Sequence, residues 1–247
     1  MGINDIATYL IIFISALVHG LLGLGFPMLA TPLLTLTADV RAAVVLLLMP
    51  TLAINLVNVI RGGHWRQSIG RFWPLALFGA VGSLLGTQLL VRVDPEPFKL
   101  VMALMILVYL NIHRLGLRLR WVRRHIIWAS ALFGLIGGLL AGTVNVMLPA
   151  LIIFALEMEL KPLVTVQIFN FSFFIGKISQ AAVLTAHGYL DGAQLLASIP
   201  LVGMALLALV IGMRYRDRIE VRVYRKWLKR TLAAIAVLLI FQYAGIV

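Results

Sequence analysis

The chain is built from long apolar segments separated by short polar and charged ones. A helix needs about 20 apolar residues to cross a hydrocarbon core of about 30 Å, and most of the segments have that length. The pattern predicts an all-α integral membrane protein with little chain outside the bilayer. The apolar segments lie near residues 6–36, 41–60, 72–91, 97–113, 126–156, 162–186, 193–213 and 228–246.

Two of these segments do not fit a single helix. Residues 6–36 contain GLLGLGFPMLATP and residues 126–156 contain GLIGGLLAGTVNVMLP, each a glycine-rich break followed by a proline. At about 31 residues, each is too long for one crossing and too short for two crossings with a turn. We expect each to fold as a re-entrant hairpin of two half-helices, which enters and leaves on one face of the membrane.

The two hairpin segments begin two similar halves of the chain. Pro32 matches Pro149, Arg41 matches Lys161, and PLALFGAVGSLLG from Pro74 matches PLVGMALLALVIG from Pro200, in the same order. This order predicts a tandem repeat within one membrane domain. The first repeat covers residues 1–120, with hairpin 6–36 and helices 41–60, 72–91 and 97–113. The second covers residues 121–247, with hairpin 126–156 and helices 162–186, 193–213 and 228–246.

Composition agrees with a membrane protein, and the positions of the charges argue against a nucleic-acid binder. The chain is 62% hydrophobic and 12% charged, has a mean hydropathy of +1.04 and carries a net charge of +12 without any cysteine. Its basic residues gather in short loops around Arg61–Arg71, Arg114–Arg124 and Arg214–Arg230. Such loops set orientation and meet anionic lipid headgroups, so membrane lipid is an expected partner and nucleic acid is not.

The same loops predict an inverted topology. The loop after helix 41–60 is basic whereas its repeat mate AHGYLDGAQ is not, and the loop VRVDPEPFK is neutral whereas its mate near Arg214–Arg230 is strongly basic. Equivalent loops therefore lie on opposite sides. With three crossings in each half, all Lys and Arg except Arg41, Arg92, Lys99 and Lys177 fall on the cytoplasmic side. We expect a multi-pass protein of a prokaryotic inner membrane with both termini outside.

One lysine is placed inside a predicted span. Lys177 lies in LVTVQIFNFSFFIGKISQAAVLTA, whereas the acidic residues fall at segment ends. It is about 15 to 22 Å along the helix from either end, which makes snorkelling to the surface unfavourable. A cation within the bilayer is costly and is usually kept for function. Without a buried carboxylate beside it, Lys177 predicts binding of an anion.

Other candidate groups lie at the breaks and in the segments that follow them. Broken helices near the midplane present backbone N–H groups to a substrate, and inverted repeats with such helices are an arrangement of secondary transporters. Glycine spacings such as Gly82 and Gly86, or Gly134 and Gly138, indicate close helix packing, whereas we assign Gly25 and Gly142 to ligand approach. His19 is a proton-coupling candidate. The predicted substrate-binding set is Lys177, Gly25, Phe26, Gly142, Thr143, Asn145, Asn55, Asn170 and Gln180.

The expected mechanism is alternating access around one central anion site. Lys177 supplies the charge, the break backbones at Gly25 and at Gly142–Asn145 supply N–H donors, and Asn55, Asn170 and Gln180 orient the anion. Intramembrane amides also commonly hydrogen-bond neighbouring helices, so each of them has a structural interpretation as well.

The two breaks also carry a family resemblance over essentially the whole chain. GLLGLGFPMLATPLLTL and GLIGGLLAGTVNVMLPALIIF, within a repeated chain, resemble the TauE/SafE family of sulfite and organosulfonate exporters. The resemblance implies transport of a small sulfur-containing anion across the cytoplasmic membrane. Phe26 and Pro27 stand where family members often have a denser glycine run, so the resemblance leaves the particular substrate open.

Two other classes fit less well. The chain contains no GxSxG or HExxH motif and no carboxylate pair within a span, so we expect neither an enzyme nor a cofactor or metal site. A cation transporter or channel that uses the backbone carbonyls of the breaks is the alternative. The sequence leaves open the anion, the direction and the coupling ion, and it is compatible with a homo-oligomer.

Overall fold

The computed structural model describes residues 6–114, 119–216 and 221–245, and at residues 113 and 221–227 it describes the backbone alone. Parts of two predicted basic loops, including Arg118 and Arg218, lie outside these residues, as do both chain ends. The described chain is helical throughout its elements, which confirms the predicted all-α class. The helices are α1 (Ile6–Leu22), α2 (Phe26–Thr35), α3 (Val40–Arg61), α4 (Ile69–Arg92), α5 (Glu96–Asn111), the short 3₁₀ helix η1 (Ile112–Arg114), α6 (Trp121–Arg124), α7 (Ile126–Val144), α8 (Leu148–Glu157), α9 (Pro162–Ala186), α10 (Gly192–Tyr215) and α11 (Val221–Tyr243).

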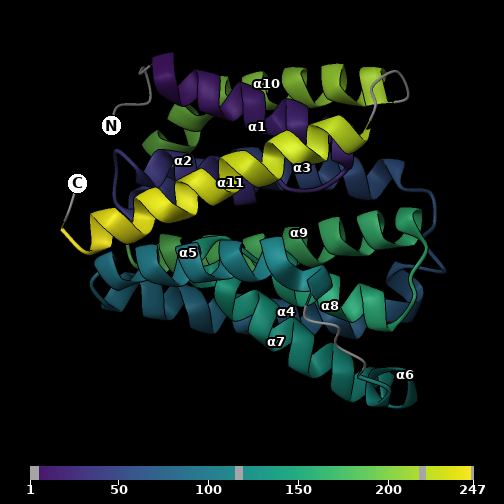
Figure 1. Cartoon of the computed structure of the whole chain (residues 1–247). Coiled ribbons are helices and arrows are strands. Elements are labelled where there is room, and N and C mark those ends of the chain that lie inside the picture. The colour runs from purple at the N-terminus through teal and green to yellow at the C-terminus, as the bar shows by residue number, and fades with distance from the viewer. Residues whose placement is uncertain (1–5, 115–118, 217–220, 246–247) are drawn as a thin grey trace.

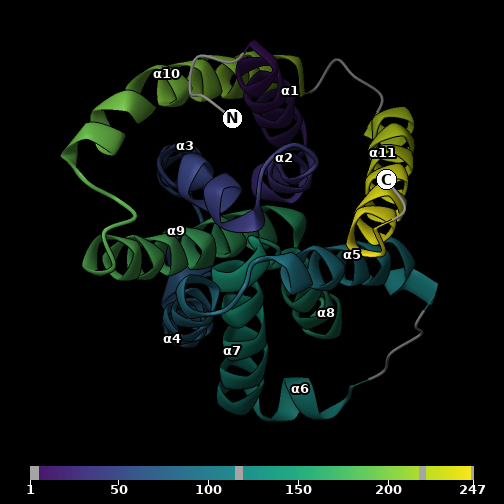
Figure 2. The ribbon, with the colours of Figure 1, turned by 90° about the vertical axis from the view of Figure 1, so that its left-hand side faces the viewer.

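The helices are stacked in layers (Figures 1 and 2). Helices α1 and α10 form one outer layer, and α2 and α3 lie between this pair and α9. Helices α4, α7 and α8 form the opposite side, with α4 packed on both α7 and α9. Helix α11 runs along α5 and touches α2. Helices α2, α3 and α9 thus occupy the centre.

Local sequence signals explain where many helices begin. Asp39 caps α3, where its side chain accepts the N–H of Ala42 at 2.8 Å. Asp191 and Gln194 form a reciprocal capping box at the start of α10. Prolines stand in the first turn of α2, α5, α8 and α9, where the missing N–H costs nothing. These residue types satisfy N–H groups that have no partner within the helix.

Glycines allow two pairs of helices to approach closely. A methyl group at Gly20 of α1 would lie 2.9 Å from the Cα of Gly212 in α10, and one at Gly86 of α4 would lie 3.1 Å from the Cα of Gly142 in α7. Gly82 and Gly134 meet backbone atoms across the α4–α7 contact in the same way, which confirms their predicted packing role. Small residues of this kind bring helix backbones into van der Waals contact within a bilayer.

Five described helices are long and apolar enough to cross a membrane, namely α3, α4, α7, α9 and α10. Four of these lie at predicted crossings, while α7 is the first arm of the second predicted hairpin. The arms of the hairpins are unequal, with 17 and 10 residues in the first and 19 and 10 in the second. Helix α5, a predicted crossing, has only 16 residues, or about 24 Å. The first arms thus extend farther than half-helices would.

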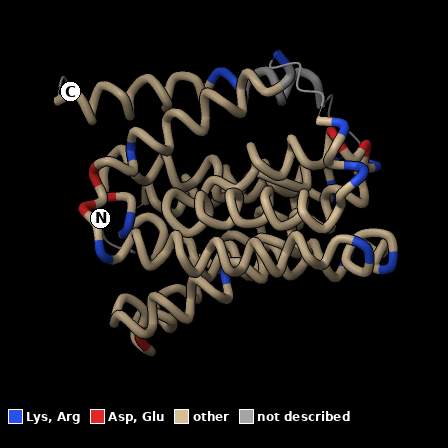
Figure 3. Tube along the Cα trace, turned by 90° about the horizontal axis from the view of Figure 1, so that it is seen from below, with Lys and Arg blue, Asp and Glu red and all other residues tan. Residues whose placement is uncertain are grey.

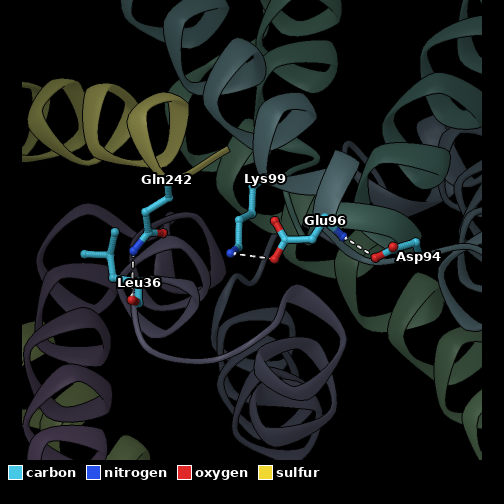
Figure 4. Close-up of polar contacts among 5 residues, drawn as sticks. All are labelled: Leu36, Asp94, Glu96, Lys99 and Gln242. Carbon is cyan, nitrogen blue, oxygen red and sulfur yellow. Dashed lines mark hydrogen bonds and ion pairs between the residues drawn. The ribbon is translucent and has the colours of Figure 1, made fainter. Parts of the chain in front are cut away.

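Charged residues gather towards the two ends of the bundle, and most of the helical middle is free of them (Figure 3). The start of α1 and the end of α11 lie at one end (Figure 1). There, Gln242 Nε2 donates to the carbonyl of Leu36 at 3.0 Å, which joins α11 to the end of α2 (Figure 4). Close by in the same view, Lys99 pairs with Glu96 at 2.9 Å, and Asp94 Oδ1 accepts the Glu96 N–H.

Candidate functional site

The first break separates α1 from α2 and consists of Gly23, Leu24 and Gly25. Gly23 and Gly25 have φ angles of 79° and 108°, values that residues with a Cβ rarely adopt. The chain can therefore reverse sharply before Phe26 and Pro27 start α2. A methyl group at Gly25 would meet no atom within 4 Å, so the break is open at this position.

His19, in the last turn of α1, closes the hairpin on itself. Its Nδ1 accepts the N–H of Phe26 at 3.1 Å, and so satisfies the first N–H of α2. A neutral imidazole that accepts through Nδ1 carries its proton on Nε2, which therefore donates to Asn170 Oδ1 at 3.2 Å. Protonation of Nδ1 would break the bond to Phe26. The predicted proton-coupling role of His19 would thus act through the shape of the first break.

Two asparagines on neighbouring helices lie beside this histidine. Asn170 of α9 donates to the carbonyls of Gly23 at 3.0 Å and Val166 at 2.7 Å, so its oxygen is free to accept from His19. Asn58 Nδ2 of α3 lies 3.1 Å from His19 Nε2, but both are N–H groups in this tautomer, and the Asn58 amide donates to the carbonyl of Ile54 at 3.0 Å. All three side chains are buried. The first break is therefore bonded to α9 through Asn170, and Asn58 of α3 lies beside it.

The second break separates α7 from α8 at residues 145–147. Asn145 ends α7 with a φ of 62°, in the left-handed region that asparagine tolerates better than most residues. Its Nδ2 donates to Thr31 Oγ1 of α2 at 2.8 Å, whereas its buried Oδ1 has no hydrogen-bond partner among the described residues. The two hairpins thus touch through Asn145 and Thr31. Pro149 then stands in the first turn of α8.

Lys177 lies beside the end of α7. Its ammonium donates to Gln180 Oε1 one turn along α9, and Gln180 Nε2 donates to the carbonyl of Gly142 at 3.1 Å. Lys177 is 2% exposed, and within the described chain no carboxylate forms a salt bridge with it. An ammonium has three N–H donors, so this bond uses only one of them.

The predicted site residues therefore fall into two clusters. Phe26 and Asn170 belong to the first break with His19, whereas Lys177, Gln180 and Asn145 belong to the second. Asn170 and Lys177 are about 10 Å apart along the axis of α9, and each is linked to a different break. A single central anion site that uses both residues stays a prediction.

Some predicted residues have contacts that explain them without a ligand. The Cα of Gly142 faces α4, where a methyl group would lie 2.7 Å from the N of Thr87, and Gly142 offers a carbonyl to Gln180. The hydroxyl of Thr143 donates to the carbonyl of Leu139 at 2.9 Å, and the ring of Phe26 is fully buried. Asn55 is different, because its buried Nδ2 has no partner in the described chain. Binding roles for these residues stay predictions.

Both breaks reach one cavity of about 210 Å³. Gly25 lines it from the first break and Leu148 from the start of α8, while Tyr109 and Lys229 line it from α5 and α11. Neither Lys229 nor Thr31 is among the predicted site residues, because a lysine in a basic run, or a threonine in an apolar hairpin, carries no distinguishing sequence signal.

The polar side chains at the two breaks determine what this region can bind. Among the described residues, no three His, Cys, Asp or Glu side chains come together as a metal site would require. The polar groups at the breaks are amides, hydroxyls, one imidazole and one ammonium. Such groups suit reversible binding of a small polar solute in a membrane.

Comparison with known proteins identifies the family. No curated protein and no solved structure matches the chain significantly. A family model described as "Sulfite exporter TauE/SafE" matches residues 8–242, which include both hairpins and the helices between and after them. This chain therefore belongs to the TauE/SafE sulfite exporter family and is a multi-pass membrane protein of a transporter family.

Proposed function

We propose that this chain is a secondary transporter that moves a small sulfur-containing anion, of the sulfite or organosulfonate class, by alternating access. The observation that carries the proposal is the burial of Lys177 without a carboxylate partner among the described residues. The charge of a lysine at the centre of a bilayer costs about 2.5–3.5 kcal/mol on insertion scales. A bound anion would offset this cost by neutralising the ammonium.

The surroundings of Lys177 supply further groups for such an ion. Gln180 orients the ammonium and is itself held by the carbonyl of Gly142. The break at Asn145 leads into α8, whose N-terminus has the positive end of a helix dipole. Asn55 of α3, a helix that packs on α9, has a buried amide donor without a partner in the described chain, and the proposal assigns this donor to the anion as well. In this proposal the anion accepts hydrogen bonds from Lys177 and from these groups.

Helix contacts support two inverted repeats and a rocking movement between them. Helix α1 of the first hairpin packs on α10, and α7 of the second hairpin packs on α4. Under the predicted repeat, α1 corresponds to α7 and α4 to α10, so each hairpin packs against the other half in an equivalent way. Transporters with inverted repeats commonly work by rocking of one repeat or bundle against the other. We infer that the hairpins move with the opposite half during transport.

Uptake into proteoliposomes tests the proposal. The purified chain is reconstituted, and flux of sulfite and of a small alkanesulfonate is measured against sodium and potassium. We expect saturable anion flux, and we expect Lys177→Met to abolish it while the protein still folds. Lys161→Met removes an exposed lysine at the start of the same helix and is the matched control.

The possible outcomes separate the competing functions. Normal anion flux with unchanged affinity in Lys177→Met would refute the role of this lysine. Cation flux without anion flux would favour the alternative in which backbone carbonyls bind the solute. A thermal unfolding measurement on the variant in detergent shows whether lost flux reflects the site or the fold.

A further inference from the structure

A second cavity lies between the C-terminal ends of α3 and α10 and the start of α9. Its volume is about 760 Å³, more than three times that of the cavity at Gly25. We call it the arginine vestibule. Its lining residues are Asn58, Arg61, Gly62, Leu163, Val166, Val210, Met213, Arg214 and Arg216.

The lining carries three arginines and no acidic residue. Among the described residues no carboxylate forms a salt bridge with Arg61, Arg214 or Arg216, and the recorded salt bridges involve other residues. Arg61 Nη1 contacts the sulfur of Met213 at 3.3 Å, which fixes its side chain across the mouth without neutralising it. A concave surface lined by one sign of charge concentrates ions of the opposite sign.

The inner side of the vestibule reaches the first break. Asn58 lines it, is buried, and lies one turn of α3 from Arg61. The same Asn58 amide lies 3.1 Å from His19 Nε2, and a methyl group at Gly23 would lie 2.9 Å from Cγ1 of Val166, which lines the vestibule from α9. Asn58 and Val166 therefore connect the lining of the vestibule to residues of the first hairpin.

We infer that the arginine vestibule is a separate binding subsite that captures a small oxyanion before it reaches Lys177. Guanidinium groups match the geometry of oxyanions through paired N–H donors, and they keep their charge at all physiological pH values. Arginines in other basic loops, such as Arg120 and Arg124, are exposed and line neither the arginine vestibule nor the cavity at Gly25. This inference rests on the proposed anion transport, because it names where the same substrate first binds.

The subsite has a kinetic consequence. Capture raises the local concentration of anion, so loss of the arginines weakens apparent affinity while the turnover of bound substrate is unchanged. In Arg214→Gln/Arg216→Gln we expect KM for sulfite to rise about tenfold with kcat within about twofold of the unmodified protein. The matched control, Arg120→Gln/Arg124→Gln, removes the same charge elsewhere and leaves KM within about twofold. The KM of the unmodified protein also rises with salt, and that dependence is weaker in the vestibule variant.

A binding measurement separates this inference from the proposed function. Calorimetry with sulfite is performed on Lys177→Met in detergent, where the inner site is disabled. Binding is expected in Lys177→Met and is expected to be lost when Arg214→Gln/Arg216→Gln is added. Arginine-dependent binding, together with an absence of anion flux in the unmodified protein, would uphold the subsite and overturn the proposed transport.

The opposite results overturn the subsite. Anion transport with the same KM in the vestibule variant and its control would leave Lys177 as the binding group and remove the vestibule from the mechanism.

Repeating the calorimetry in nanodiscs of zwitterionic lipid and of anionic lipid identifies the source of the oxyanion. If sulfite binds only in zwitterionic lipid and does not displace bound anionic lipid, the vestibule is a site for lipid headgroups. This result would contradict the inference.

Discussion

Asn170 and Lys177 lie on the same face of α9, two helical turns apart, and each serves a different break. Asn170 bonds to Gly23 and His19 at the first break, and Lys177 is joined through Gln180 to the end of α7 at the second. One rigid helix therefore fixes the spacing of the two polar clusters at about 10 Å. A displacement of α9 would therefore change the hydrogen bonds at both breaks together.

Gln180→Glu tests whether Lys177 must stay without a counter-charge. The carboxylate has nearly the same shape as the amide and pairs directly with the ammonium, so it competes with any anion for Lys177. We expect anion transport to fall at least about tenfold while the protein still folds. A tenfold loss corresponds to about 1.4 kcal/mol of anion-binding free energy, which is the energy of one or two hydrogen bonds. Flux assays in proteoliposomes measure the loss.

The control for this variant is Gln194→Glu. Gln194 forms the capping box of α10, a position where glutamate serves as well as glutamine. Transport should be unchanged in this variant. Equal flux in Gln180→Glu and Gln194→Glu would show that a neutralised Lys177 still transports, which contradicts its proposed role.

His19 is expected to act as a positioning residue at the first break. His19→Leu leaves the Phe26 N–H and the Asn170 oxygen buried without their present partner, at about 1–3 kcal/mol for each group. His19→Asn retains a side-chain acceptor at the Nδ1 position and should recover part of this loss. Thermal unfolding in detergent ranks the three proteins.

His19→Asn also tests proton coupling. Asparagine does not bind a proton near neutral pH, so a role of His19 in coupling predicts that this variant loses the response of anion flux to an imposed pH gradient. An undiminished response in a folded, active His19→Asn protein would assign coupling to another group or to the substrate itself.

The contact between α4 and α7 is expected to tolerate no side chain at Gly138. A methyl group there would overlap the carbonyl of Gly79, whereas one at Gly203 of α10 would meet no atom within 4 Å. Overpacking of this kind typically costs about 1–3 kcal/mol. Gly138→Val should therefore lower the Tm, and Gly203→Val should leave it nearly unchanged. Equal Tm values would mean that the two helices are free to separate.

The sequence predicted the helices well because their signals are local. Asp39, Asp191 and the prolines mark helix starts, and the glycines of the first break supply positive φ angles. The position of the breaks in space was harder to predict. The first arms of the hairpins are about 25 Å and 28 Å long, which is more than half of a hydrocarbon core of about 30 Å.

The contacts that link α9 to the two breaks were also hard to predict. Asn170 bonds to Gly23 at the first break, and Lys177 is joined through Gln180 to Gly142 at the end of α7. The partners of Gly142 and Asn145 also depend on packing between distant segments, on α4 and α2 respectively. One sequence alone contains no signal for such pairings.

The absence of cysteine allows the predicted topology to be tested on the natural background. Gln67 is exposed in the loop after α3, Ala193 is exposed in the first turn of α10 next to the loop that corresponds under the repeat, and Tyr243 is exposed at the end of α11. Inverted repeats with outside termini predict that a membrane-impermeant maleimide labels Ala193→Cys and Tyr243→Cys in intact cells. Gln67→Cys should react only after the membrane is opened. Labelling of Gln67→Cys and Ala193→Cys from one side would exclude the inverted arrangement. Labelling with all sides reversed would retain the repeat but would place the arginine vestibule outside, where it could not capture an anion for export.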